Sequence, residues 1–124
     1  MSEYQYYEFV AIDRPLTRFE QAELRQVSAR GRISASSFVN HYDFGGLKAD
    51  PRDWMTRYFD AHLYLANWGD RRIALRLPVR LLDPRLAAVY CTGHFASCWS
   101  TDEHVILDLR GGYWPPTRSE PGSG

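Results

Sequence analysis

Residues 50–78, DPRDWMTRYFDAHLYLANWGDRRIALRLP, hold the clearest helix start and the clearest hairpin of the chain. Asp50 before Pro51 is typical of a helix start, because the carboxylate accepts from backbone N–H groups without a helical partner and proline fits the first helical position. The apolar residues that follow have the spacing of one helical stripe: Trp54, Met55, Tyr58, Phe59 and His62. The sequence therefore predicts a helix from Asp50 that buries this stripe.

After residue 62 the pattern changes from helical to alternating. Residues 63–68, LYLANW, are apolar on both alternate sets, as in an interior strand, whereas residues 72–77, RIALRL, alternate as in a half-exposed strand. Gly69-Asp70 between them suits a two-residue type II′ turn, with glycine where φ must be positive. We therefore expect a β-hairpin closed by this turn.

The expected turn also fixes which side chains share a face. Counting outward from it places Tyr64 opposite Leu75 on an apolar face. Arg72 and Arg76 then lie on the other face, which is predicted to be solvated.

The composition is that of one globular domain. The chain has 124 residues, of which 44% are hydrophobic and 15% aromatic, enough for one core and too few residues for two domains. The formal net charge is zero, so the field of the whole molecule does not steer it toward nucleic acid or an anionic membrane. Two cysteines, no signal peptide and no apolar run of about 20 residues predict a cytoplasmic protein with reduced thiols.

The N-terminal third predicts a strand, a helix and a second strand. Residues 4–12, YQYYEFVAI, are apolar on both faces, as in a central strand. Thr17 with Glu20 is a capping-box pattern and predicts a helix to about Arg30. The expected buried side of this helix is formed by four apolar residues, Leu16, Phe19, Leu24 and Val27. Residues 33–44 alternate as a strand.

Asp83-Pro84 repeats the Asp-Pro helix start, and residues 90–99 and 104–109 are the last strand candidates. The resulting order, β-α-β-α-β-β-α-β-β, predicts an α+β fold: a single-domain sandwich of a mixed, mainly antiparallel sheet with its helices mostly on one face.

The domain is expected to end near residue 110. Residues 111–124, GGYWPPTRSEPGSG, are rich in glycine, proline and serine and predict a flexible tail or linker after an α+β domain of residues 1–110.

Five segments together resemble the N-terminal region of a family of uncharacterised bacterial proteins: YQYYEFVAIDRPL, SFVNHYDFGGLKADP, RYFDAHLYLANWG, RRIALRLPVRLLDP and DEHVILDL. The resemblance covers residues 3 to about 110. It implies that the members continue past the position of Leu109 into a further, largely helical region, and that this chain is a shorter form or one module of such a protein. The resemblance implies no activity.

Cys91, His94, Cys98 and His104 have the residue types and number of a tetrahedral zinc site. Their spacing, C-x2-H-x3-C-x5-H, matches no standard zinc motif, and in an extended strand Cys91 and Cys98 point to opposite faces. Ordinary core or surface placement is favoured, and no metal or other cofactor is expected.

His41, Asp43 and His62 carry imidazole and carboxylate groups suited to acid–base catalysis or to binding a small molecule. No nucleophile elbow, phosphate loop or HExxH-type pattern accompanies them. A packing role for His62 is favoured, and an enzyme or small-molecule binder is an alternative. Four aromatic residues fit a pocket between helix and sheet, although core packing is favoured for them: Trp54, Tyr58, Tyr64 and Trp68.

Four arginines of the hairpin are predicted to form a basic row on one of its faces: Arg71, Arg72, Arg76 and Arg80. Asn67 and Trp68 lie beside this row, near the turn of the hairpin. Arginine beside aromatic rings is typical of single-stranded nucleic-acid binding. The zero net charge and the absence of an RNP-like motif favour instead a solvated face, whose arginine stems cover Leu63 and Leu65.

The absence of a recognisable catalytic motif leads to our leading hypothesis. We expect a non-enzymatic interaction module that binds a protein partner or its own copy. The aromatic and arginine residues left outside the core are expected to make this contact. Nucleic-acid binding through residues 71–80 is a further alternative, and membrane binding is not expected.

Overall fold

The computed structural model describes residues 4–43, 45–92 and 95–112. This part of the chain contains three helices and one antiparallel sheet of seven strands, in the order β-α-β-β-α-β-β-α-β-β. The strands are β1 (Gln5–Val10), β2 (Arg32–Ile33), β3 (Ser37–Tyr42), β4 (Ala61–Ala66), β5 (Arg71–Pro78), β6 (Ala96–Ser100) and β7 (His104–Gly111). The helices are α1 (Arg18–Val27), α2 (Pro51–Arg57) and α3 (Pro84–Tyr90). The predicted α+β class is confirmed.

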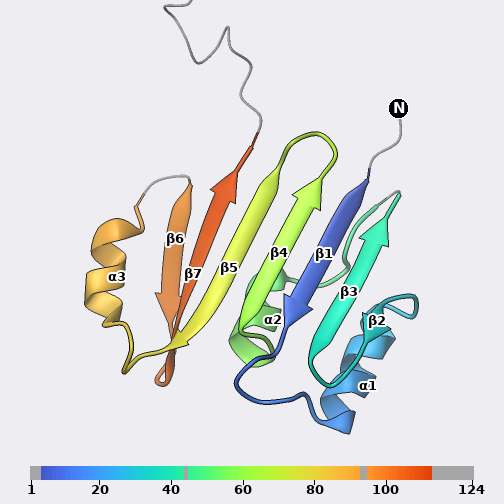
Figure 1. Cartoon of the computed structure of the whole chain (residues 1–124), viewed down its shortest axis with the longest axis horizontal. Helices are drawn as coiled ribbons and strands as arrows, with labels where there is room; N and C mark the ends of the chain where they lie inside the picture. The colour runs from blue at the N-terminus through green and yellow to red at the C-terminus, as the bar shows by residue number, and fades with distance from the viewer. Residues whose placement is uncertain (1–3, 44, 93–94, 113–124) are drawn as a thin grey trace, which may run out of the picture.

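The strands lie side by side in the order β2-β3-β1-β4-β5-β7-β6 (Figure 1). β1 pairs with β3 on one side and β4 on the other, which confirms the central strand predicted from residues 4–12. All the described pairings are antiparallel, so the expected mixed sheet is wrong in this part of the chain. The single strand expected over residues 33–44 is divided into β2 and β3.

The helix starts follow the local sequence signals. Thr17 and Glu20 form the predicted capping box, in which each side chain accepts from the other's backbone N–H, at 3.0 and 2.9 Å. Asp50 and Asp83 cap α2 and α3 by accepting from the backbone nitrogens two residues on, both at 2.9 Å. In the described part of the chain, no helix has the length and apolarity needed to cross a membrane.

α2 ends at Arg57, so the predicted apolar stripe is shared by three segments. Trp54 and Met55 lie in the helix, Tyr58 and Phe59 follow it, and His62 belongs to β4. All five side chains are nevertheless buried. The helix is short because the chain must turn at residues 58–60 to begin the next strand.

α1 buries a narrower side than predicted and ends at Val27 rather than near Arg30. Leu16 and Leu24 are in the core, whereas Phe19 and Val27 are exposed. The chain then passes close to the sheet at Gly31, where an added Cβ would lie 2.7 Å from Cε2 of Phe38.

The turn between β4 and β5 is longer than predicted. Gly69 N–H donates to the carbonyl of Ala66 at 3.0 Å, and Gly69 has a φ of 106°, so residues 67–69 form a three-residue loop. Tyr64 therefore lies opposite Arg72 instead of Leu75. Because the register differs by an odd number of residues, the side chains that share a face are exchanged. The predicted placement of the arginines is wrong.

The main core lies between one face of the sheet and the helices α1 and α2. Phe9 stands at its centre, with ring centroids 5.1 Å from Trp54 and 5.2 Å from Phe59. We call this side of the sheet the helix face. In Figure 1, α2 lies behind β4 and β1, and the side toward the viewer, which we call the open face, has no helix in front of these strands. α3 packs beside the edge strand β6.

Candidate functional site

The open face carries two adjacent rows of largely apolar side chains. Residues opposite one another in antiparallel strands share a face. The first row runs across β4, β5 and β7 through Leu63, Ile73 and Leu109. The second row, two residues further along the strands, consists of Val10, Ala61, Leu75 and Leu107.

Four residues form what we call the open-face patch: Leu65, Ile73, Leu75 and Leu109. They are 38, 49, 40 and 47% exposed respectively. A shallow, largely apolar hollow of about 290 Å³ borders two of them, Ile73 and Leu75, at the small side chain of Ala61. Contiguous exposed apolar area of this kind marks a surface that contacts another molecule. The patch is therefore the candidate interaction surface.

On the helix face, Arg76 and Asp60 form a buried ion pair that we call the Asp60 clasp. Asp60 accepts from Arg76 at 2.9 Å through Oδ1, and from the backbone nitrogens of Ile12 and Asp13 at 2.7 and 2.9 Å through Oδ2. Arg76 also donates to the carbonyl of Thr56 at 3.0 Å. Burial alone would raise the pKa of Asp60, but these backbone hydrogen bonds and the Arg76 guanidinium bring it below its usual value. The clasp ties the ends of β1 and α2 to β5.

A second buried carboxylate, Asp108 of β7, holds two arginines. Arg72 donates to it through Nε and a terminal nitrogen at 2.8 and 2.7 Å, and a terminal nitrogen of Arg110 lies 3.8 Å away. Arg72 and Arg110 are opposite one another in the register of β5 and β7. Arg72 is largely covered, whereas the Arg110 side chain is 55% exposed.

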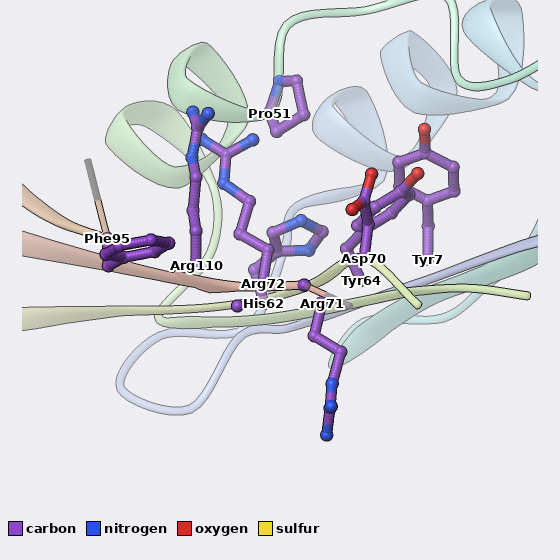
Figure 2. Close-up of a pocket in the computed structure, with 11 residues that line it drawn as sticks. Tyr7, Pro51, His62, Tyr64, Asp70, Arg71, Arg72, Phe95 and Arg110 are labelled. Carbon is purple, nitrogen blue, oxygen red and sulfur yellow. The ribbon is translucent and has the colours of Figure 1, made fainter. Parts of the chain in front are cut away.

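Above these arginines the helix face forms a pocket of about 690 Å³. Figure 2 shows Arg72 and Arg110 rising into it beside Phe95, with Tyr7, Tyr64 and Asp70 at the other end and Pro51 above. Arg71, although it borders the pocket, points its side chain to the opposite face of the sheet. The pocket therefore has a cationic end and an end with a carboxylate.

His62 lies at the floor of this pocket and is 3% exposed. Its Nδ1 donates to the carbonyl of Glu8 at 3.0 Å, so Nε2 is left as an acceptor. That Nε2 is buried and has no hydrogen-bond partner among the described residues. Burial lowers the pKa of His62 from 6.5 to about 4, with Arg72 acting in the same direction and Asp108 against it.

The acid–base candidates are not brought together. His62 is on the helix face, whereas His41 lies opposite Tyr6 on the open face, with its ring centroid 5.6 Å from that of Tyr4. Asp43 is exposed beyond the end of β3. The grouping of His41, Asp43 and His62 therefore has no common site.

The arginine row is also divided between the two faces. Arg72 and Arg76 are ion-paired on the helix face, Arg71 is on the open face, and Arg80 follows β5. The expectation that their stems cover Leu63 and Leu65 is wrong for Arg72 and Arg76, because those leucines are on the open face. The nucleic-acid alternative thus loses the continuous basic surface on which it rested.

Asn67 and Trp68, the other predicted binding residues, serve the hairpin loop. Asn67 Oδ1 accepts from the backbone of Tyr4 at 3.1 Å, and the indole of Trp68 donates to Asp70 at 2.7 Å. Of the four aromatic residues, Trp54 and Tyr58 are in the core, as favoured, and Tyr64 borders the pocket.

The predicted zinc ligands are only partly described. His94 lies outside the described residues, Cys91 caps the end of α3, Cys98 is in β6 and His104 begins β7. Cys98 lies opposite Leu107 on the open face, so it points away from His104. Within residues 4–43, 45–92 and 95–112, no three His, Cys, Asp or Glu side chains are grouped as metal ligands.

The residues that sequence reasoning missed are Asp70, Asp108 and Arg110. The sequence holds a signal for Asp108, because this residue is two positions from Ile106 and therefore points to the same, buried face of β7. A charged residue at an inward position requires an opposite charge nearby. Its partner Arg72 is 36 residues away in the sequence, so the pair is visible only in three dimensions.

No family model, no curated protein and no solved structure was found to match the chain. The resemblance to uncharacterised bacterial proteins therefore stays a prediction, and function has to be argued from the two faces of the sheet.

Proposed function

We propose that the chain is a non-enzymatic self-association module whose open face packs against the open face of a second copy. The observation that carries this proposal is the open-face patch, four half-exposed aliphatic side chains that are contiguous across β4, β5 and β7. The contact residues are thus aliphatic, in place of the aromatic and arginine residues expected from the sequence.

A second copy is favoured because the surface is self-complementary. A two-fold contact joins the same patch from both copies, and two sheets pack face to face when apolar side chains from each interdigitate. Among the described residues, Glu8 lies opposite Leu63 and borders the hollow, and Arg71 lies opposite Leu65, so these two charges of opposite sign stand beside the apolar rows. The formal net charge of zero leaves no long-range repulsion between copies.

The expected strength of self-association follows from the exposed apolar area of the open-face patch that a second copy would cover. Burying the exposed half of one leucine or isoleucine side chain stabilises by about 1 kcal/mol. The four patch residues on two copies then contribute about 8 kcal/mol, which exceeds the lower estimates, about 4 kcal/mol, of the cost of bringing two molecules together. We therefore expect a reversible dimer with a concentration-dependent mass.

Light scattering over a concentration series tests this proposal. We expect the native chain to approach twice its monomer mass as concentration rises, and Ile73→Glu to weaken dimerisation at least about a hundredfold, because a two-fold contact would bury two unpaired carboxylates. Val89→Glu is the matched control, since Val89 is exposed on α3 away from the patch.

Either of two results would contradict the proposal. One is a native chain that remains monomeric at every concentration. The other is a Val89→Glu chain that dissociates as completely as the Ile73→Glu chain.

A further inference from the structure

We propose that the pocket on the helix face binds a small zwitterionic organic acid, whose acid group lies against Arg72 and Arg110 and whose amino group faces Asp70. This site is on the opposite face from the open-face patch and is independent of it.

The cationic end of the pocket has more positive charge than its partner neutralises. Arg72 and Arg110 stand opposite one another, a placement that is unfavourable for like charges, and both face the single carboxylate of Asp108. The Nη1 group of Arg72 makes no hydrogen bond to any residue that the structure describes, and Arg110 is half-exposed in the pocket. An oxyanion placed above Asp108 would accept from both guanidinium groups.

The other end of the pocket carries hydrogen-bond acceptors. Asp70 comes immediately before β5 and two residues before Arg72, so it projects from the same face about 7 Å further along the chain. It accepts from the Trp68 indole and makes no ion pair with any described residue. Asp70 is exposed, and Gly112 comes so close to its carboxylate that an added Cβ would lie 3.1 Å from Oδ1. An ammonium group would complete this end.

His62 adds an independent indication of a ligand. Its Nε2 is a buried acceptor without a partner among the described residues, and the imidazole stands at the pocket floor beside Arg72 (Figure 2). An unsatisfied buried acceptor is destabilising unless a donor reaches it. An N–H or O–H group of a bound molecule is such a donor.

The walls suit a planar apolar body between the two polar ends. Phe95 borders the cationic end, and Tyr7 and Tyr64 border the other. Both tyrosine hydroxyls donate to Oε1 of Gln5 at 3.0 Å, so the rings present mainly apolar surface. A volume of about 690 Å³ is in the range of small-molecule sites.

Three probes built on one benzene ring separate the two charges. These are 3-(aminomethyl)benzoate, which carries both, benzoate, which has only the acid group, and benzylamine, which has only the amino group. In calorimetric titrations of the full chain, we expect the zwitterion to bind at least about tenfold more tightly than either single-charge probe, the difference expected for one charge-assisted hydrogen bond.

Two variants assign the ends, and a third is their control. Arg110→Gln should reduce zwitterion affinity to that of benzylamine, and Asp70→Asn should reduce it to that of benzoate. Arg71→Gln removes the same charge as Arg110→Gln from the neighbouring strand, but its side chain points to the open face, so affinity should be unchanged. The self-association measured by light scattering should be the same for Arg110→Gln and the native chain.

Several results would overturn the proposal. No measurable binding of the zwitterion, or equal binding of all three probes, removes the two-ended site. An Arg71→Gln chain that loses as much affinity as Arg110→Gln shows that the binding is unspecific attraction to positive charge.

Discussion

Replacing Asp60 with alanine is expected to lower the free energy of unfolding by about 3–5 kcal/mol, because the buried Arg76 guanidinium loses its only carboxylate among the described residues. Both side chains of the pair are only 8% exposed, so water cannot replace the lost contacts. The backbone nitrogens of Ile12 and Asp13 lose their acceptor as well. Urea unfolding followed by circular dichroism measures the change.

Asp53→Ala is the control for the Asp60 clasp. Asp53 pairs with Arg57 one turn away on the exposed side of α2, and such a pair contributes about 0.5 kcal/mol or less. A second variant, Arg76→Met combined with Asp60→Ala, should recover part of the loss, since no charge is then left buried without a partner. If Asp60→Ala were as mild as Asp53→Ala, the clasp would not stabilise the fold.

The free energy of unfolding is expected to fall by about 3 kcal/mol between pH 6.5 and pH 4 through His62 alone. Burial lowers the pKa of His62 to about 4 in the folded chain, whereas the unfolded chain has the ordinary value of 6.5. Between these values the unfolded state binds the proton and the folded state does not, so stability is lost as pH falls. The loss is complete below about pH 4.

His62→Phe should remove this pH dependence, because phenylalanine keeps the stacking on Phe9, whose ring centroid is 3.9 Å away, and cannot be protonated. His41→Phe, on the exposed open face, is the control and should retain the dependence. The lowered pKa of Asp60 acts only at more acidic pH, below the ordinary aspartate value, so the two windows are separate. Urea titrations at a series of pH values measure both, and an unchanged pH profile for His62→Phe would contradict the assignment.

The helix starts and the central strand could be predicted because they depend on neighbouring residues. The two residues of the capping box, Thr17 and Glu20, are three positions apart in the sequence. In the Asp-Pro starts at Asp50 and Asp83, the two residues are adjacent. These signals are complete within a single turn of chain. Helix ends were less predictable, since α2 ends at Arg57 while apolar residues continue into the following turn and strand.

The faces of the hairpin could not be predicted, because they depend on the length of one loop. The sequence allows Gly69 to serve in a two-residue or a three-residue loop, and the choice decides whether Arg72 shares a face with Tyr64. What settles it is distant: Asp60 and Asp108 neutralise Arg76 and Arg72 on the helix face. The same exchange puts Ile73 and Leu75 on the open face. The candidate interaction surface and the pocket therefore both arise from a register that local pattern does not encode.

The central claim, that the open face is covered by a second copy, is tested most directly by methyl NMR with a soluble paramagnetic agent at low and high protein concentration. We predict that the methyl groups of Ile73, Leu75 and Leu109 become protected from relaxation as concentration rises, whereas those of Ile12 and Leu86, exposed outside the open-face patch, stay accessible. Equal relaxation of Ile73 at both concentrations, or equal protection of Leu86, would contradict the claim.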